Sequence, residues 1–325
     1  MANIGIIGGG AFGTAMACVV RRSGHDVLLW AREPEVVDSI NSAGVNRQFL
    51  AGAQLVPGIV ATGDLAAATA HAEVLVLAPP AQRMREVTTA LRPHLKPGLP
   101  VVSCSKGIER GTLALMPEVL AETLPQARIA ILSGPSFARE LAEDLPCGVA
   151  LAAADLSLAR ALATTIANPH FCVHPIDDLI GAAIGGVMKN VIAIASGVAA
   201  GRKLGENARA TVITLGLTEA VRLGLAKGAS RETFDGLAGI GDMMLTANSL
   251  HSRNTSFGVA LGEGKSAAEV LAGRTVVTEG AASAEGIVAL ARKLGVDMPI
   301  SQAVDQVLNH HADLDEMIAR VMAHR

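Results

Sequence analysis

A lysine in apolar surroundings is the residue of this chain best suited to proton transfer. Lys189 interrupts an apolar segment with helical periodicity, and its neighbours one turn away are Gly185, Gly186, Ile192 and Ala193, with no acid among them. Burial disfavours the charged form of a lysine, so such a residue can act as an acid or a base near neutral pH. A surface lysine that extends its ammonium into solvent fits the same pattern. The sequence leaves both interpretations open.

A glycine-rich segment near the start of the chain is suited to binding phosphate. The spacing Gly8-x-Gly10-x-x-Gly13 follows a short apolar segment, residues 4–7, and opens a segment rich in Ala and Val. Gly8 permits a tight turn, Gly10 lets the backbone approach a pyrophosphate, and Gly13 lets the helix pack closely on the strand. The free N–H groups of the helix start hold the phosphate charge. A second apolar strand at 26–30 completes the pattern, which predicts a dinucleotide-binding site.

The residue that follows the second strand bears on which dinucleotide fits. NAD-selective sites place an acid there to bind the ribose hydroxyls, but this strand is followed by Arg32, and the first acid is Glu33. A guanidinium is suited to pairing with a 2′-phosphate. The sequence therefore predicts that NADP(H) is accepted, with NAD(H) also open. A solvated Arg32 with no cofactor role is the alternative.

Four further polar segments break the apolar pattern. Residues 103–107, which include Lys106, and residues 133–138 follow predicted strands and face the ligand side of a parallel sheet. Residues 239–242 frame Asp242 with glycines in an expected loop, and residues 252–254 are expected to begin a helix. Each segment has an ordinary structural alternative: Ser136 as a helix cap, Asp242 as a turn residue, and a solvated helix start.

The elements that must position these residues fall into two groups. Up to about residue 175, apolar strands alternate with helices, which predicts an α/β fold with a Rossmann-like, doubly wound, mostly parallel sheet. Later strands at 148–152 and 171–173 are expected to extend the sheet, and residues 44–63 are expected to be irregular. Beyond residue 177 the pattern is helical throughout. We therefore predict a dinucleotide-binding domain, residues 1–175, and an all-helical substrate and catalytic domain, residues 176–325.

Composition excludes several classes of protein. The net charge is −3 without a basic block, and the chain has six Phe, one Trp and no Tyr, so a nucleic-acid partner is not expected. No spacing of His and Cys predicts a metal site, and the four cysteines are expected to be buried thiols in a reducing cytoplasm. The apolar N-terminus lacks the basic region of a signal peptide, and its glycines argue against a membrane helix.

In combination, these motifs identify a family. The glycine turn, Ser105-Lys106-Gly107, Gly134-Pro-Ser-x-Ala138, Lys189-Asn190, the Gly239–Asp242 segment, Ser252-Arg253-Asn254 and Val277-Thr-Glu279-Gly280 occur in one order. In this order they resemble the bacterial NAD(P)-dependent glycerol-3-phosphate dehydrogenases, over about residues 3–300. The resemblance implies a cytoplasmic oxidoreductase that interconverts dihydroxyacetone phosphate and sn-glycerol 3-phosphate and supplies phospholipid synthesis.

The resemblance also implies roles for individual residues. Lys189 corresponds to the catalytic acid/base, Lys106 to a second cation near substrate and cofactor, and Asp242 to a partner of substrate and lysine. Substrate contacts are implied for Lys106, Gly134, Ser136, Lys189, Asp242, Ser252, Arg253 and Asn254. Cofactor contacts are implied for Gly8, Gly10, Ala11, Phe12, Gly13, Arg32, Lys106, Ala138, Arg253, Val277 and Glu279.

Other functions and one departure from the family stay open at this point. A reductase of small hydroxy or keto acids, of the beta-hydroxyacid dehydrogenase or ketopantoate reductase type, and a non-catalytic dinucleotide sensor are the alternatives. Many relatives carry basic residues where this chain has Thr255-Ser256, which reduces positive charge beside the predicted phosphate site. The apolar helices of the second domain favour a homodimer, and no integral membrane association is expected.

Overall fold

The computed structural model describes residues 1–272 and 278–323, which form two compact units. The first comprises Met1–Ser105 and Met116–Leu179, and the second comprises Lys106–Leu115 and Ile180–Arg325. The segment Lys106–Leu115, which the sequence analysis assigned to the N-terminal domain, thus belongs with the helical unit.

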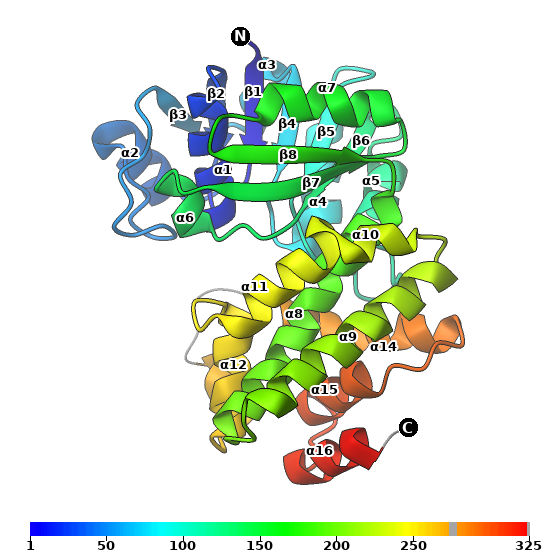
Figure 1. Ribbon diagram of the computed structural model, residues 1–325. Helices are drawn as coiled ribbons and strands as arrows, with labels where there is room; N and C mark the ends of the chain where they lie inside the picture. The colour runs from blue at the N-terminus through cyan, green and yellow to red at the C-terminus, as the bar shows by residue number, and fades with distance from the viewer. Residues whose placement is uncertain (273–277, 324–325) are drawn as a thin grey trace. The chain divides into compact units, whose positions relative to one another are not determined.

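The first unit is built on one eight-stranded sheet with the order β3-β2-β1-β4-β5-β6-β7-β8 (Figure 1). All neighbouring strands are parallel except β6 and β7. The first six strands follow the order of a dinucleotide-binding sheet, so the predicted fold class is confirmed, and β7 and β8 extend the sheet as expected. The strands are β1 (Asn3–Ile7), β2 (Asp26–Trp30), β3 (Ile59–Thr62), β4 (Val74–Leu77), β5 (Pro100–Ser103), β6 (Arg128–Ser133), β7 (Cys147–Ala153) and β8 (Phe171–Ile176).

Helices cover both faces of this sheet, which explains why its strands are apolar without alternation. Ile4 and Ile6 of β1 pack into a core with residues of α1, α2, α6 and α7. Gly5, between them, faces the opposite side, where a Cβ would lie 2.6 Å from the Ala68 carbonyl oxygen of α3. The helices of this unit are α1 (Ala11–Arg22), α2 (Pro34–Ala43), α3 (Leu65–His71), α4 (Met84–Leu91), α5 (Met116–Thr123), α6 (Ala138–Ala142) and α7 (Leu156–Ile166).

Two expectations for the first unit are wrong. The stretch 44–63, expected to be irregular, contains the edge strand β3. This strand is only four residues long, and its buried residues alternate with more exposed ones. The four cysteines are free, but only Cys18 and Cys104 are buried, and Cys172 on the edge strand β8 is exposed.

From Ile180 onward the described residues of the second unit form helices joined by connections, with α8 at the centre (Figure 1). Its other segment, Lys106–Leu115, is not helical and is closed by an isolated bridge between Ile108 and Leu115. Residues of α8 contribute to two apolar cores, one shared with α9, α11, α14 and α15 and one shared with α12, α14 and α15. The helices are α8 (Leu179–Gly201), α9 (Glu206–Ala226), α10 (Arg231–Asp235), α11 (Asp242–Asn248), α12 (Arg253–Gly262), α13 (Ala267–Ala272), α14 (Glu279–Lys293), α15 (Pro299–Asn309) and α16 (Leu314–Ala323).

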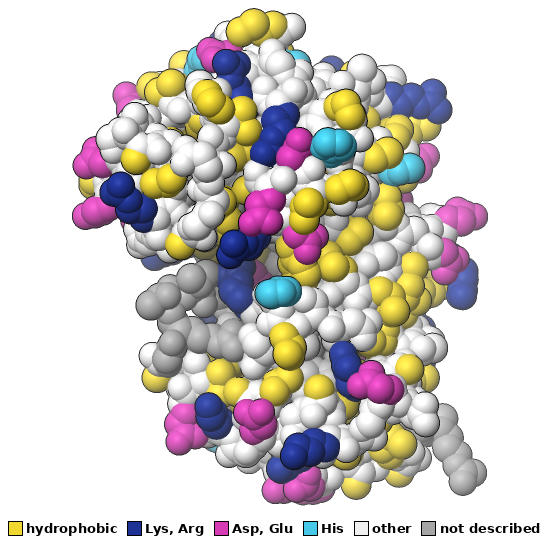
Figure 2. Space-filling view, turned by 60° about the vertical axis from the view of Figure 1, so that its left-hand side comes forward, with side chains coloured by type: hydrophobic (Ala, Val, Ile, Leu, Met, Phe, Trp, Pro, Cys, Tyr) yellow, Lys and Arg dark blue, Asp and Glu magenta, His cyan; other side chains and the backbone are white. Residues whose placement is uncertain are grey.

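Helix α8 is long and apolar enough to cross a membrane by length and composition. However, 78% of its apolar window is buried inside the protein, so it serves as a core helix here. The face of the molecule in Figure 2 carries interspersed side chains of both charges, without a continuous basic patch.

A buried carboxylate joins two helices of this unit. Helix α15 has no cap from its own side chains, and Glu219 of α9 accepts hydrogen bonds from the backbone N–H groups of Ile300 (2.6 Å) and Ser301 (3.1 Å) instead. Burial raises the pKa of Glu219, although the hydrogen bonds to Ser301 and Ile300 oppose this. The negative charge lies at the positive end of the helix dipole, where it stabilises the packing of α9 on α15.

Candidate active site

The glycine turn of the first unit has the geometry of a phosphate cradle. Gly8 has φ +125°, and a Cβ on Gly13 would lie 1.9 Å from the Gly8 carbonyl oxygen, so both positions require glycine. A Cβ on Gly10 would meet nothing within 4 Å, and no side chain caps α1, which begins at Ala11. Open space therefore faces a helix start whose first N–H groups have no intrahelical acceptor. The residues fit the diphosphate of a dinucleotide.

Arg32 lies directly after β2, as the sequence predicts for a residue near a ribose. Its side chain is 71% exposed, and its Nη2 lies 2.7 Å from Oε1 of Glu33. An exposed ion pair of this kind contributes little to stability. The guanidinium is therefore available for exchange between Glu33 and a phosphate at little energetic cost.

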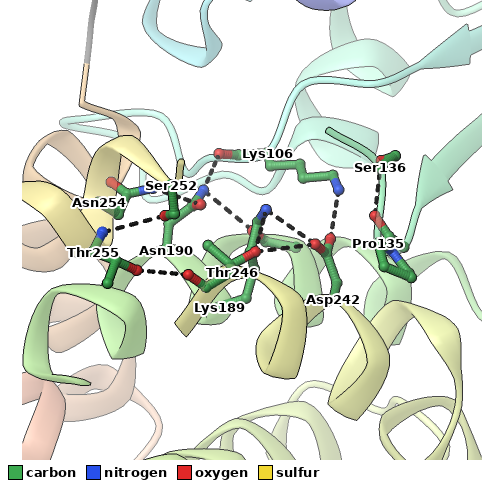
Figure 3. A network of polar contacts seen from close by, with 12 residues as sticks. Lys106, Pro135, Ser136, Lys189, Asn190, Asp242, Thr246, Ser252, Asn254 and Thr255 are labelled. Carbon is green, nitrogen blue, oxygen red and sulfur yellow. Dashed lines mark hydrogen bonds and ion pairs between the residues drawn. The ribbon is translucent and has the colours of Figure 1, made fainter. Parts of the chain in front are cut away.

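Two lysines and an aspartate form a compact charged cluster in the helical unit (Figure 3). Lys189, near the middle of α8, places Nζ 3.0 Å from Oδ1 of Asp242. Lys106 donates to the other oxygen, Oδ2, at 2.5 Å. Side-chain exposure is 13% for each lysine and 1% for Asp242. The structure thus brings together the three residues that the sequence analysis singled out for catalysis, from segments up to 136 residues apart.

Burial and mutual charge set the protonation of this cluster. Burial, helped by the Lys106 and Arg253 charges, lowers the pKa of Lys189 to about 8, and the Asp242 carboxylate opposes this shift. Burial by itself raises the pKa of Asp242, but the two ammonium groups outweigh it and hold the pKa below its ordinary value. At neutral pH Asp242 is therefore a carboxylate, and Lys189 can change its protonation state close to that pH.

Asp242 is not in the loop that the sequence analysis expected. A π-helical turn, η3 (Leu237–Gly241), connects α10 to α11, and Asp242 is the first residue of α11. Gly239 packs against buried Phe234, where a Cβ would lie 2.1 Å from the Phe234 carbonyl oxygen. The glycines therefore allow a π-helical turn to pack closely against Phe234, where a loop was expected. Such turns occur frequently at functional sites.

Helix α11 is short and is held in place by side chains of other helices. Thr246, one turn after Asp242, accepts a hydrogen bond from Lys189 Nζ (3.0 Å), and its hydroxyl lies 3.3 Å from Asp242 Oδ1. Its carbonyl oxygen accepts from Thr255 Oγ1 (2.6 Å), and the next carbonyl, of Ala247, accepts from Ser196 Oγ (2.9 Å). A seven-residue helix is not stable alone, so these bonds fix the orientation of the Asp242 carboxylate.

A second polar network surrounds the start of α12. Ser252 caps the helix by accepting from the Thr255 N–H, which confirms the helix start predicted at 252–254. Asn254 donates to Asn190 Oδ1 (2.8 Å) and accepts from the N–H of Gly280 (3.0 Å), so α8, α12 and α14 meet at one buried amide pair. Asn190 and Asn254 thus form a hydrogen-bonded support beside the lysine cluster (Figure 3).

Arg253 follows the cap and is the guanidinium of this network. Its side chain reaches the surface, but the surrounding protein desolvates it and lowers its pKa, an effect that the Glu279 carboxylate opposes. An arginine stays charged in any protein environment. The position is therefore a permanent positive charge that is only partly hydrated, which favours binding of a phosphate dianion.

The remaining predicted site residues belong to the first unit or lie outside the described residues. Gly134, after β6, has φ +144°, and a Cβ there would lie 2.9 Å from the Val149 Cα. Ser136 Oγ donates to the Gly134 carbonyl oxygen (2.9 Å) and caps no helix, because the N-cap of α6 is Phe137. The interpretation of Ser136 as a helix cap is therefore wrong. Ala138 begins α6, and Val277 lies outside the described residues.

Sequence reasoning missed the hydroxyl and amide groups that hold the cluster: Thr246, Thr255, Ser196 and the pairing of Asn190 with Asn254. Their signal is weak, because a single Thr or Ser in a helix is ordinary. Burial of several polar side chains in otherwise apolar helices would distinguish them, but a sequence does not reveal which side chains are buried.

Comparisons with known proteins find relatives over nearly the whole chain. Residues 3–159 match the sequence model of the NAD-dependent glycerol-3-phosphate dehydrogenase N-terminus, and residues 178–319 match that of the C-terminus. A glycerol-3-phosphate dehydrogenase (NAD(P)+) of Caulobacter vibrioides is 51% identical over 321 residues, which cover 99% of this chain and 97% of the relative. The corresponding protein of Parvibaculum lavamentivorans is 49% identical, with coverage of 99% and 96%. A glycerol-3-phosphate dehydrogenase crystal structure from Coxiella burnetii superposes with a TM-score of 0.94 at 35% identity, and covers 99% of each chain.

Proposed function

The chain belongs to the NAD-dependent glycerol-3-phosphate dehydrogenase family, and from this premise we propose how its residues interconvert dihydroxyacetone phosphate and sn-glycerol 3-phosphate. The observation that carries the proposal is the buried cluster of Lys189, Asp242 and Lys106. It provides one titratable acid with a pKa near the working pH and a second fixed cation beside it.

Lys189 is the acid/base of the proposed mechanism. During reduction its ammonium donates a proton to the carbonyl oxygen of the ketone as that oxygen becomes an alkoxide. During oxidation its neutral amine removes the proton from the hydroxyl of glycerol 3-phosphate. A pKa of about 8 makes both protonation states accessible near neutral pH, which suits a reversible reaction.

Asp242 and Lys106 adjust the electrostatics of this step. The Asp242 carboxylate counteracts desolvation and keeps Lys189 charged often enough to act as an acid. Lys106 supplies positive charge that stabilises the developing alkoxide. Thr246 and Asp242 both accept from Lys189 Nζ, which orients the ammonium and leaves its third N–H for transfer to the substrate.

Bound NADPH or NADH supplies the hydride. The glycine turn, with the first N–H groups of α1, holds the diphosphate, and Ala11 and Phe12 contribute those N–H groups. Arg32 pairs with a 2′-phosphate by exchanging its bond to Glu33, which makes NADP(H) acceptable beside NAD(H). Cofactor contacts by Ala138, Arg253, Val277 and Glu279 stay predictions from the family resemblance.

Arg253 and Asn254 bind the phosphate of the substrate in this proposal. The guanidinium forms charge-assisted hydrogen bonds with a phosphate dianion, and Ser252 holds the start of α12 in the required position. Substrate contacts by Gly134 and Ser136 stay predictions.

We also propose that the enzyme is a cytoplasmic homodimer that associates through its helical domain and supplies glycerol 3-phosphate for phospholipid synthesis.

A substrate panel tests the proposed function. Initial rates are measured with NADPH and with NADH, each against dihydroxyacetone phosphate, ketopantoate and the oxidised form of 3-hydroxyisobutyrate. We expect turnover with dihydroxyacetone phosphate and rates at least about 100-fold lower with the two carboxylates, because a site built for phosphate leaves its polar groups unpaired with other substrates. Turnover of a carboxylate alone would overturn the proposal.

Arg253→Ala tests the phosphate site. We expect kcat/KM for dihydroxyacetone phosphate to fall at least about 50-fold, mostly through KM, because charge-assisted hydrogen bonds to the phosphate are lost. The matched comparison is dihydroxyacetone, which lacks the phosphate and should lose less than about threefold. Arg202→Ala, which removes an exposed pair with Asp315 elsewhere in the unit, is the control variant. Equal losses for both substrates would contradict the assignment.

A further inference from the structure

One buried amide side chain is bonded to the glycine turn of the first unit. Asn46 lies in the connection between α2 and β3 and is fully buried. Its Nδ2 donates to the Gly9 carbonyl oxygen and to Thr14 Oγ1, both at 2.8 Å, and its Oδ1 accepts from the Phe49 N–H at 3.0 Å. Because a backbone N–H can only donate, the bond from Phe49 fixes which end of the amide is oxygen. Both donors of Asn46 therefore face the turn.

This contact fixes the peptide that joins Gly9 to Gly10. In a planar trans peptide the carbonyl and the following N–H point in opposite directions, so holding the Gly9 oxygen inside directs the Gly10 N–H outward. The two glycines differ accordingly. A Cβ on Gly9 would lie 2.4 Å from the Ala31 Cβ, whereas a Cβ on Gly10 would meet nothing within 4 Å. Gly9 is buried against Ala31, the residue after β2, and Gly10 faces open space.

We propose that Asn46 is a positioning residue for the cofactor. It holds the Gly9 carbonyl so that the Gly10 N–H and the start of α1 are aimed at the diphosphate of the bound dinucleotide. Asn46 touches no reacting atom in this proposal, and it acts only through the turn. The inference rests on the proposed dinucleotide binding and adds a residue outside the glycine motif on which that binding depends.

The chemistry of the position explains why an amide is needed. Gly9 has a buried acceptor, and its other hydrogen-bond donor, Thr14 Oγ1, is at 3.4 Å. A carboxylate in place of the amide would keep the acceptor for Phe49 but would face the Gly9 oxygen without a hydrogen. Repulsion between the two oxygens would then rotate the peptide, and the outward N–H would lose its direction.

The test compares NADPH affinity and stability in matched variants of the full-length protein. Asn46→Ala and Asn46→Asp are each expected to raise the Kd for NADPH, measured by fluorescence titration at pH 8, at least about tenfold. The control is Asn41→Ala, because Asn41 makes a similar pair of bonds with the backbone of Ala61 (2.9 and 2.8 Å) in the same unit. Because Asn41 is exposed, Asn41→Ala should lower Tm less than Asn46→Ala, and it should keep the Kd within about twofold of wild type.

Asn46→Asp also provides a readout that a purely structural role does not. Protonation of the introduced carboxyl restores a donor toward Gly9, so the Kd of Asn46→Asp relative to wild type should recover at pH 5.5. Wild-type affinity in both Asn46 variants, or an equal loss in Asn41→Ala, would overturn the inference. Failure of the wild-type protein to bind NADPH would instead contradict the proposed function itself, so the two failures are distinguishable.

Discussion

Replacing Lys189 by methionine is expected to lower kcat for dihydroxyacetone phosphate at least about 1,000-fold. The variant loses the proton donor and one of two positive charges near the developing alkoxide, each of which contributes at least about 100-fold in comparable enzymes. The Kd for NADPH should stay within about threefold of wild type, because the glycine turn belongs to the other compact unit. Steady-state rates and a fluorescence titration measure the two quantities separately.

Lys189→Arg separates proton transfer from charge. A guanidinium keeps the positive charge but does not release its proton at accessible pH, so this variant should lose about as much kcat as Lys189→Met. Retention of a tenth or more of wild-type activity in Lys189→Arg would show that charge alone suffices. Loss of NADPH binding together with activity in both variants would indicate that Lys189 is structural.

Replacing Asp242 by asparagine is expected to produce the largest combined loss of stability and activity. The change leaves two buried ammonium groups side by side without their carboxylate, and breaking such a pair costs about 3–5 kcal/mol in the free energy of unfolding. The pKa of Lys189 should fall further, because the Asp242 carboxylate is the group that opposes burial and the Lys106 charge. A larger fraction of Lys189 is then neutral at pH 7 and its ammonium loses the carboxylate that holds it, so kcat/KM for reduction should drop at least about 100-fold.

The pH dependence of stability gives a second test of Asp242. Its lowered pKa means that its ion pairs stabilise the folded state at neutral pH and that this contribution is lost as the pH falls below the ordinary aspartate range, about 4. Asp242→Asn should therefore lose less stability on acidification than wild type, as measured by urea unfolding. Asp305→Asn is the control, since Asp305 is also buried but bonds to Asn309 in α15. A destabilised Asp305→Asn with normal kinetics is expected, and equal kinetic losses in both variants would refute the assignment of Asp242.

The sequence was sufficient to predict which residues form the charged cluster but not the way they are held. Lys189 stands out because an ammonium in an apolar helix needs a partner, and the sequence near it contains no acid. The partner, Asp242, comes from a segment 53 positions away, and only the fold brings them together. Thr246, Thr255 and Asn46 carry no local signal, because their importance lies in buried backbone groups that they satisfy.

The fold shows the same division between local and tertiary information. The strands and the glycine turn follow from apolar runs and from backbone positions that exclude a side chain, both of which are local. The short edge strand β3 and the π-helical turn before Asp242 depend on pairing with β2 and on packing against Phe234. The assignment of Lys106–Leu115 to the helical unit is likewise a tertiary property, because the segment follows a strand of the sheet in sequence.

The central claim, that Lys189 is the acid/base, is tested most directly by the pH dependence of kcat/KM in both directions. Reduction of dihydroxyacetone phosphate needs the ammonium, so its kcat/KM should fall as the pH rises through about 8. Oxidation of glycerol 3-phosphate needs the neutral amine, so its kcat/KM should rise through the same midpoint. Both midpoints should move to lower pH in Asp242→Asn. Profiles with the same direction, or midpoints that Asp242→Asn leaves in place, would contradict the claim.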